Sequence, residues 1–264
     1  MSSQRSWVRI PDMVPPNHIR HSKHSALALL SHLAASPTPL TTAELAQRTE
    51  LHRASVYRKL ESLVSEGWLE VEGTPHRYSV SWGVPQLGLL ALRNRHTHEV
   101  VLIRATELAR ALDAPTWFGF YFGSSGVGLL NDLPILLPAG LSVPPSCVSG
   151  GLILLAYQED AEIERMAHLG LPRFTDRTIT EPAGIIAQAR KARQLGYAVS
   201  NHEYVTGLIK FSVPVFDSKG VVASLSTRCP DSGPTPDMLG IANDIAERAS
   251  LELGHRAGIR SVIA

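Results

Sequence analysis

Residues 42–80 carry the pattern that most constrains how this chain can fold. The segment TAELAQRTELHRASVYRKLESLVSEGWLEVEGTPHRYSV reads as two short helices followed by a β-hairpin. A capping-box spacing at Thr41 and Glu44 starts the first of these helices, and Gly67 follows the second. One buried stripe is expected along the second helix, formed by Val56, Leu60, Leu63 and Val64. With a further helix expected at about residues 25–35, this layout predicts a winged helix-turn-helix.

Bulk composition narrows the class of protein. The chain has 264 residues, of which 44% are hydrophobic and 19% charged, an ordinary balance for about two globular domains. No apolar run approaches the length needed to cross a bilayer, and the first residues lack the apolar centre of a signal peptide. Two cysteines give no disulfide framework and fit a reducing compartment. We therefore expect a cytoplasmic protein without membrane contact.

The charge is distributed unevenly. The net charge is only +1, but residues 1–60 hold eight Lys or Arg against three Asp or Glu. That segment is thus net +5, which leaves −4 for the rest of the chain. A basic end on a neutral-to-acidic body is typical of a DNA-binding module joined to a second domain.

Four segments are predicted along the chain. Residues 1–22 are expected to be a flexible arm, and residues 23–81 the winged helix-turn-helix. Residues 82–97 are apolar on several sides, which predicts a linker helix that buries its surface in a homodimer. In residues 98–264, strand-like runs and tight turns alternate with helices, which favours an α+β domain over a parallel doubly wound one.

The second helix of the 42–80 segment has the side chains expected of a helix that reads DNA. Arg53 can pair with guanine in the major groove, whereas Arg58 and Lys59 are expected to contact phosphates. In the hairpin, His76 and Arg77 are expected to touch a flanking backbone or minor groove. The full set of predicted DNA contacts is Thr42, Arg53, Ala54, Ser55, Tyr57, Arg58, Lys59, His76 and Arg77. The alternative is that these residues are only the solvated side of an amphipathic helix.

Two strands near the carboxyl end suggest an anion-binding pocket. If Leu208–Val215 and Val221–Arg228 pair around the turn DSKG, Lys210 comes opposite Arg228. Such a like-charge pair costs free energy unless solvent or an anion reaches it. Ser149 is expected to cap a helix whose amino end favours a carboxylate. One face of the strand pair is expected to hold Ile209, Phe211, Val213, Val215, Val221, Ala223, Leu225 and Thr227. The other is expected to hold Leu208, Lys210, Ser212, Ser224, Ser226 and Arg228. The alternative is that this polar face is simply exposed to solvent and binds no ligand.

Taken together, these motifs resemble those of the IclR (isocitrate lyase regulator) family of bacterial transcription factors. The matching segments are LTTAELAQRTELHRASVYRKLESLVSEGWLEV, RFTDRTIT, LGYAVSNHEYVTGL and FSVPVFDSKGVVASLS, in the family's order. The resemblance covers nearly all the chain beyond residue 22. LHRASVYRKL is particularly similar to the branch that regulates breakdown of aromatic acids.

The resemblance implies a GAF-like effector domain that binds a small carboxylic acid, and a homodimer often paired into a homotetramer. It implies operator DNA as a partner, with RNA polymerase as a further candidate. The pocket positions are Trp117, Ile135, Leu137, Val143, Ser149, Gly150, Leu208, Lys210, Ser226 and Arg228, with Tyr121 as another flat wall. Two segments depart from the family's pattern, PPSCVSGGLI and the reduced acidic cluster at residues 200–203.

Enzyme motifs are absent from the sequence. GSSGVG lacks the spacing of a nucleophile elbow, and no spacing supports Cys147 as a nucleophile. No phosphate-loop lysine, dinucleotide fingerprint or Cys/His zinc spacing appears. We therefore predict no catalytic residue, cofactor or metal. A small-molecule-binding enzyme with an appended DNA-binding-like module is the alternative, and effector identity, operator sequence and the sign of regulation stay open.

Overall fold

The computed structural model describes residues 25–93, 95–122, 125–130, 141–169 and 173–255. They divide into two compact units, with the division between Arg95 and His96. The predicted residues 1–22, Ile135 and Leu137 lie outside the described residues.

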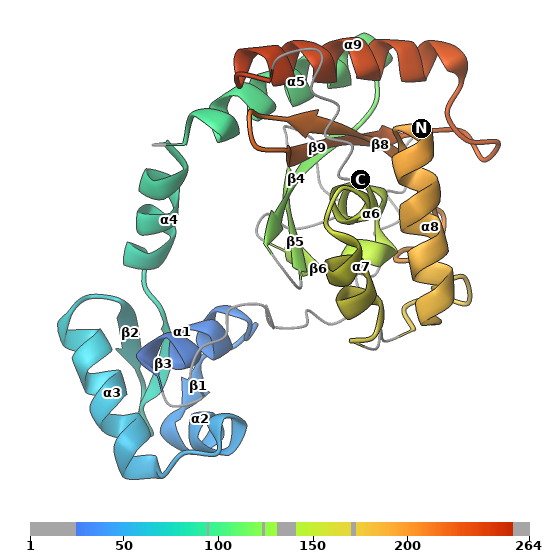
Figure 1. Ribbon diagram of the computed structural model, residues 1–264. Coiled ribbons are helices and arrows are strands. Elements are labelled where there is room, and N and C mark those ends of the chain that lie inside the picture. The colour runs from blue at the N-terminus through green and yellow to red at the C-terminus, as the bar shows by residue number, and fades with distance from the viewer. Residues whose placement is uncertain (1–24, 94, 123–124, 131–140, 170–172, 256–264) are drawn as a thin grey trace, which may run out of the picture. The chain divides into compact units, whose positions relative to one another are not determined.

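The N-terminal unit consists of three helices, a small sheet and a fourth helix (Figure 1). The helices are α1 (Ala26–Ala34), α2 (Thr42–Thr49), α3 (Arg53–Ser65) and α4 (Gly83–Arg93). The strands are β1 (Leu40–Thr41), β2 (Leu69–Glu72) and β3 (Arg77–Val80), which pair antiparallel in the order β1-β3-β2. This is the winged helix-turn-helix that the sequence predicts.

Local chemistry explains where these helices begin. At the start of α2, the Thr41 hydroxyl accepts from the Glu44 N–H over 3.2 Å, and a Glu44 carboxylate oxygen accepts from the Thr41 N–H over 2.7 Å. This reciprocal pair satisfies two amides that a helix start leaves open. The predicted stripe of α3 is confirmed for Val56, Leu60 and Leu63, which are buried in the core of this unit, while Val64 is half-buried against it.

The C-terminal unit is built on a six-stranded antiparallel sheet. Its order is β6-β5-β4-β9-β8-β7, so β9 lies between β4 and β8. The strands are β4 (Thr116–Phe122), β5 (Ser125–Leu130), β6 (Leu141–Val143), β7 (Ala198–Asn201), β8 (Ile209–Phe216) and β9 (Val221–Arg228). The predicted pairing is confirmed, with Lys210 directly opposite Arg228.

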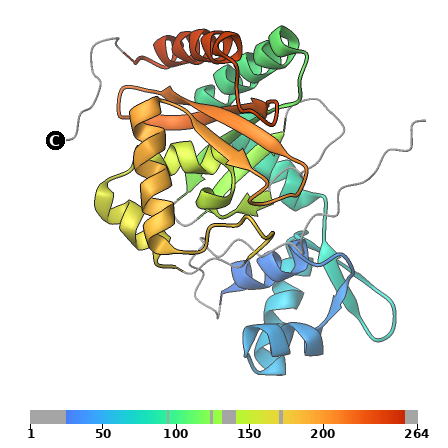
Figure 2. The same ribbon diagram turned by 90° about the vertical axis from the view of Figure 1, so that its right-hand side faces the viewer.

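Helices cover both faces of this sheet (Figures 1 and 2). On one face lie α5 (His96–Leu112) and α9 (Pro236–Glu252), side by side over a core that includes Phe118, Phe211 and Leu225. On the other face lie the turn η1 (Pro145–Cys147) and the helices α6 (Ser149–Ala156), α7 (Asp160–Ala167) and α8 (Pro182–Leu195). Within this second layer α6 is the central helix, because its side chains are almost all buried against the sheet, α7 and α8. The observed mixture of helices and antiparallel strands is the predicted α+β fold.

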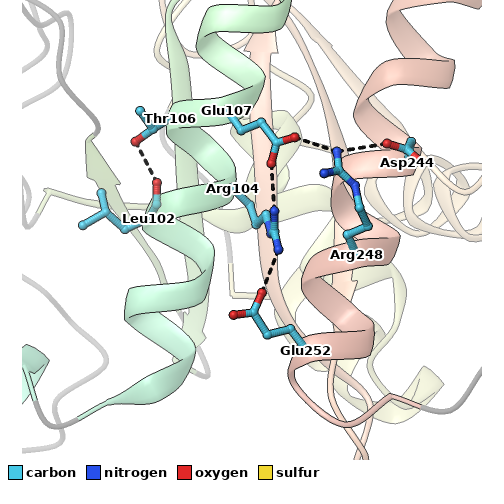
Figure 3. Close-up of polar contacts among 7 residues, drawn as sticks. All are labelled: Leu102, Arg104, Thr106, Glu107, Asp244, Arg248 and Glu252. Carbon is cyan, nitrogen blue, oxygen red and sulfur yellow. Dashed lines mark hydrogen bonds and ion pairs between the residues drawn. The ribbon is translucent and has the colours of Figure 1, made fainter.

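An ion-pair network joins α5 to α9 on their outer side (Figure 3). Arg104 binds Glu107 and Glu252, each over 2.9 Å. Arg248 binds Glu107 over 2.7 Å and Asp244 over 3.0 Å. Two of these four links join the helices, Arg104 with Glu252 and Arg248 with Glu107, so the network fastens the first helix of this unit to the last.

One detail of the predicted C-terminal unit is wrong. Val221 was expected on the face of Ala223, but it packs with the α6–α8 layer, and Val222 packs toward α5 and α9 instead. The cause is a register shift between Val215 and Phe216, because one extra residue in a strand exchanges the faces beyond it.

Candidate functional site

The first turns of α3 present a basic, exposed surface. Arg53, Ala54, Tyr57 and Arg58 are exposed, and Tyr57 retains 43% of its accessible surface. Ser55 and Lys59 are half-buried beside the stripe that anchors the helix. Thr42, at the first position of α2, is half-buried as well. The structure thus brings the predicted α3 residues onto one helix that projects from a packed core, which is the form that enters a major groove.

The hairpin of β2 and β3 gives Arg77 a role within the unit. Arg77 Nη1 donates to the Pro39 carbonyl oxygen over 2.9 Å and lies 3.7 Å from a Glu44 carboxylate oxygen. The side chain therefore ties the hairpin to the start of α2 while staying half-exposed. The DNA contacts expected of His76 and Arg77 stay predictions.

Sequence reasoning missed the acidic side of the hairpin. Glu70 and Glu72 are both exposed on β2, and Glu72 is the cross-strand partner of Arg77. The alternation in LEVE was the available signal, because it places both carboxylates on one face. Since carboxylates repel phosphates, we expect DNA to meet the turn of the hairpin rather than this face.

In the C-terminal unit, Lys210 is the unusual charge. The residue is 5% exposed, and among the described residues no ion pair or hydrogen bond engages its ammonium group. Its cross-strand neighbours are Ser200 on β7 and Arg228 on β9, neither of which can neutralise it. Burial lowers the pKa of Lys210 to about 8. Nζ lies 4.9 Å from the centroid of the Trp117 ring, a cation–π arrangement.

A chain of buried hydroxyls stands beside this lysine. Ser212 Oγ lies 2.7 Å from both Ser149 Oγ and Ser226 Oγ, which links α6, β8 and β9. Ser224 Oγ is buried without a partner among the described residues. Gly150 packs directly on these hydroxyls, since a Cβ there would lie 2.8 Å from Ser226 Oγ and 3.0 Å from Ser224 Oγ. The serine hydroxyls thus form the floor beneath the amino end of α6.

The predicted capping role of Ser149 is wrong. Val148 is the residue that caps α6, with extended backbone and no side-chain hydrogen bond, and Ser149 is the first helical residue. The physical reason is that the Ser149 hydroxyl is bound to Ser212 instead. The first N–H groups of a helix that lacks a side-chain cap are left to other acceptors, as an anion site requires.

An apolar cluster that contains Trp117 lies beside the lysine and next to the start of α6. Trp117, Leu208, Cys147, Val148 and Tyr204 are buried together in it. This arrangement brings together the predicted positions Trp117, Ser149, Gly150, Leu208, Lys210 and Ser226. Arg228, opposite Lys210, is exposed at the end of β9, and Tyr121 instead donates to Glu162 over 2.6 Å. Val143 belongs to β6, but its side chain is outside the described part of the structure.

Sequence reasoning also missed Glu203. Its side chain is buried, burial raises the pKa of the carboxyl, and the Asn201 N–H donates to it. The alternation that places other residues fails here because Glu203 follows β7 in an irregular turn. Burial also raises the pKa of the Cys147 thiol to about 12, so this cysteine is no activated nucleophile.

The described residues contain neither a membrane-spanning helix nor a cluster of metal ligands. No helix in the described ranges is both long and apolar enough to span a bilayer. Nor do these residues contain a group of three His, Cys, Asp or Glu that could hold a metal ion.

Comparison with known proteins decides the family. Residues 26–73 match the IclR helix-turn-helix domain, and residues 129–239 match the C-terminal domain of bacterial IclR transcriptional regulators. The chain belongs to the IclR family. It is 30% identical over 194 residues to the HTH-type transcriptional regulator KdgR of Escherichia coli, covering 71% of this chain and 74% of KdgR. It is 29% identical over 209 residues to the Pca regulon regulatory protein of Pseudomonas putida, covering 76% of this chain and 71% of that protein.

Solved structures of IclR proteins share this fold. A regulator from Silicibacter sp. TM1040 superposes with a TM-score of 0.73 at 24% identity, covering 86% of this chain and 92% of that one. An IclR homologue from Microbacterium hydrocarbonoxydans, complexed with 4-hydroxybenzoate, superposes with a TM-score of 0.69 at 21% identity. The match covers 87% of this chain and 99% of that one. This IclR protein is therefore a transcriptional regulator with a DNA-binding domain and a C-terminal effector domain, and the enzyme alternative is set aside.

Proposed function

We propose that this IclR regulator controls catabolic genes in response to a small carboxylic acid with an apolar, aromatic body. The acid binds in the C-terminal unit, and binding changes the affinity of the N-terminal unit for operator DNA. The observation that carries this proposal is the buried Lys210, which faces Trp117 and has no carboxylate partner among the described residues.

Electrostatics supports an anionic effector. A buried charge is strongly unfavourable unless it is paired, and the cross-strand neighbours of Lys210 are a serine and an arginine. The amino end of α6 adds backbone N–H groups and the positive end of the helix dipole. A carboxylate between Lys210 and α6 would satisfy both groups at once.

The apolar cluster supports an effector with a ring. Trp117, Tyr204 and Leu208 offer flat or apolar surfaces beside the lysine. The 4-hydroxybenzoate complex of the Microbacterium homologue agrees with an aromatic acid. The remaining proposed pocket residues are Ile135, Leu137, Val143, Ser149, Gly150, Ser226 and Arg228.

The exposed surface of α3 is proposed to read the operator. Arg53 and Arg58 are exposed and Lys59 is half-buried on α3. We expect Arg53 to bind a guanine edge, and Arg58 and Lys59 to bind phosphates. Thr42, Ala54, Ser55, Tyr57, His76 and Arg77 complete the proposed contacts.

The protein is proposed to act as a homodimer through α4. Trp82 is 83% exposed, and Leu87, Leu89 and Leu90 on this helix are each more than half exposed. Apolar side chains gathered in this way favour burial against a second copy. We assign residues 23–81 to DNA binding, 82–97 to the linker and 98–264 to effector binding. We further propose that the regulator is cytoplasmic, that its dimers can pair into tetramers, and that it can contact RNA polymerase.

Arg53→Ala tests the division of roles. Removing a guanine-reading arginine should weaken binding to the protein's own upstream DNA by about 1–3 kcal/mol, measured at fixed salt against random duplex. Affinity for a carboxylic acid found by thermal-shift screening should not change. Arg190→Ala on α8, an exposed arginine of the other unit, is the control. Equal weakening of DNA and acid binding by Arg53→Ala would contradict the proposal.

A further inference from the structure

The end of α3 is held in one conformation by its last turn. Gly67, just beyond the helix, has a φ of +80°, a left-handed conformation that favours glycine. Its N–H donates to the Val64 carbonyl oxygen over 3.0 Å, and the Trp68 N–H donates to the Leu63 carbonyl oxygen over 2.8 Å. These two bonds form a Schellman motif. The carbonyl oxygen of Gly67 takes no part in this motif, so it can accept from a donor elsewhere in the unit.

Ser81 is that donor, and it lies just before α4. Its Oγ donates to the Gly67 carbonyl oxygen and accepts from the N–H of Gly83, the first residue of α4, over 3.1 Å. Its N–H donates to the Trp68 carbonyl oxygen over 3.0 Å. Ser81 is 8% exposed, so water competes little for these bonds. One buried residue thus joins the end of α3 to the start of α4.

The direction of α4 depends on its first turn. Residues 85–91 of this helix are all exposed, whereas Gly83 is half-buried. Packing between α4 and the other described residues of its unit is therefore concentrated where the helix begins. The fit there is tight, since a Cβ on Gly83 would lie 3.1 Å from the Gly67 carbonyl oxygen and 3.6 Å from the Trp68 ring. The angle between α3 and α4 is thus set by the contacts around Ser81.

We propose that Ser81 is a positioning residue for operator recognition, which sets the direction of α4 relative to α3. The inference rests on the homodimer through α4 and the reading of DNA by α3 that are proposed above. In such a dimer each α4 is fixed against its partner, so the angle between α4 and α3 sets the separation of the two α3 helices. Dimeric helix-turn-helix proteins bind half-sites separated by about one helical turn or a multiple of it. The Ser81 junction therefore selects the operator spacing.

Loss of the Ser81 hydroxyl should loosen this junction and leave the rest of the unit folded. The backbone bond from Ser81 to Trp68 stays in place, and so does the buried stripe of α3. Binding to two half-sites would then have to order the junction, which lowers affinity. One ordinary hydrogen bond contributes about fivefold to an equilibrium constant, so losing two lowers affinity by at most about 25-fold. Binding to a single half-site requires only one α3 and should not change.

DNA duplexes of varied spacing test the proposal on the full-length protein. Footprinting on the protein's own upstream DNA first defines the half-sites. Duplexes then carry a single half-site, both half-sites at the native spacing, or both with base pairs added between them. Each added base pair moves one half-site by about 3.4 Å and turns it by about 35°. The parent should bind the native spacing most tightly. Ser81→Ala should bind it about tenfold more weakly, respond little to added base pairs, and bind a single half-site as the parent does.

A second variant perturbs the same junction without removing a hydrogen-bonding group. Gly83→Ala places a Cβ 3.1 Å from the Gly67 carbonyl oxygen, a contact that should tilt α4. This variant should therefore shift or flatten the dependence on spacing. Ser65→Ala is the control, because the Ser65 hydroxyl is exposed and bonds to Ser62 within α3. It should keep the parent's affinities on every duplex.

The outcomes separate this inference from the proposed function. A dependence on spacing that is unchanged in Ser81→Ala and Gly83→Ala overturns the positioning role and leaves the homodimer in place. Equal weakening of single and paired half-sites by Ser81→Ala shows a general loss of stability, and overturns it too. If the parent is monomeric in sedimentation, or binds every spacing equally, the homodimer through α4 is wrong and the positioning role fails with it.

Discussion

Replacing Lys210 by methionine should make the effector-free protein more stable. Burial moves the pKa of this lysine from 10.5 to about 8, and 2.5 pKa units correspond to about 3 kcal/mol at 1.36 kcal/mol each. Loss of the contact with Trp117 removes about 1 kcal/mol of compensating cation–π attraction. Methionine keeps most of the aliphatic chain, so the net gain at pH 7 is about 2 kcal/mol.

The stability difference between Lys210→Met and the parent protein depends on pH. Below pH 8 the folded and unfolded states both carry a protonated Lys210, so the full penalty applies. Between pH 8 and 10.5 the unfolded state binds more protons, and the stability of the parent protein rises with pH. The advantage of Lys210→Met should therefore be largest at pH 7 and less than about 1 kcal/mol at pH 10.

Urea unfolding followed by circular dichroism, at equal protein concentrations and at both pH values, measures this difference. Other titrating groups cancel between parent and variant. If Lys210→Met is less stable than the parent at pH 7, or its advantage does not shrink with pH, the lysine is not an unpaired buried cation. The same variant should lose its response to acids, so stability and ligand binding should change in opposite directions.

Three further substitutions test the packing that holds both units. Gly151→Ala should cost about 3 kcal/mol, because the new Cβ would lie 2.5 Å from Pro145, and a thermal midpoint equal to the parent's would contradict it. Arg193→Gln should lower the free energy of unfolding, measured in urea, by about 2 kcal/mol, because Arg193 donates to the carbonyl end of α6 and to Asp160. The control Arg190→Gln should change it by under about 0.5 kcal/mol. Thr41→Ala should cost about 1 kcal/mol, seen as faster amide exchange in α2 while exchange in the C-terminal unit is unchanged.

Local sequence signals were enough to predict the N-terminal unit. Its elements follow one another closely, and the capping box at Thr41 and the stripe from Val56 to Leu63 are each set within a few residues. The antiparallel pairing of β8 and β9 was predictable for the same reason, because a short turn joins them and fixes Lys210 against Arg228.

The effector site depends on contacts that are distant in the sequence. The pairing of β4 with β9 places Trp117 beside Ser226, and no local pattern encodes that neighbour. The hydrogen bond that Ser212 donates to Ser149 of α6, in place of the expected cap, is also non-local. Val221 packs with the α6–α8 layer because the strand pairing shifts register between Val215 and Phe216. A prediction from strict alternation cannot include such a shift.

The linked hydroxyls of Ser149, Ser212 and Ser226 have a directional consequence. Each hydroxyl has one proton, so the middle oxygen can donate to only one neighbour and must accept from the other. An acceptor arriving at the Ser149 end would claim its proton, make Ser212 donate toward α6, and make Ser226 donate toward Ser212. Binding of an acceptor at the amino end of α6 would thus set the direction of the hydrogen bonds among these serines without any backbone movement. A group that accepts no hydrogen bond would leave the opposite direction available.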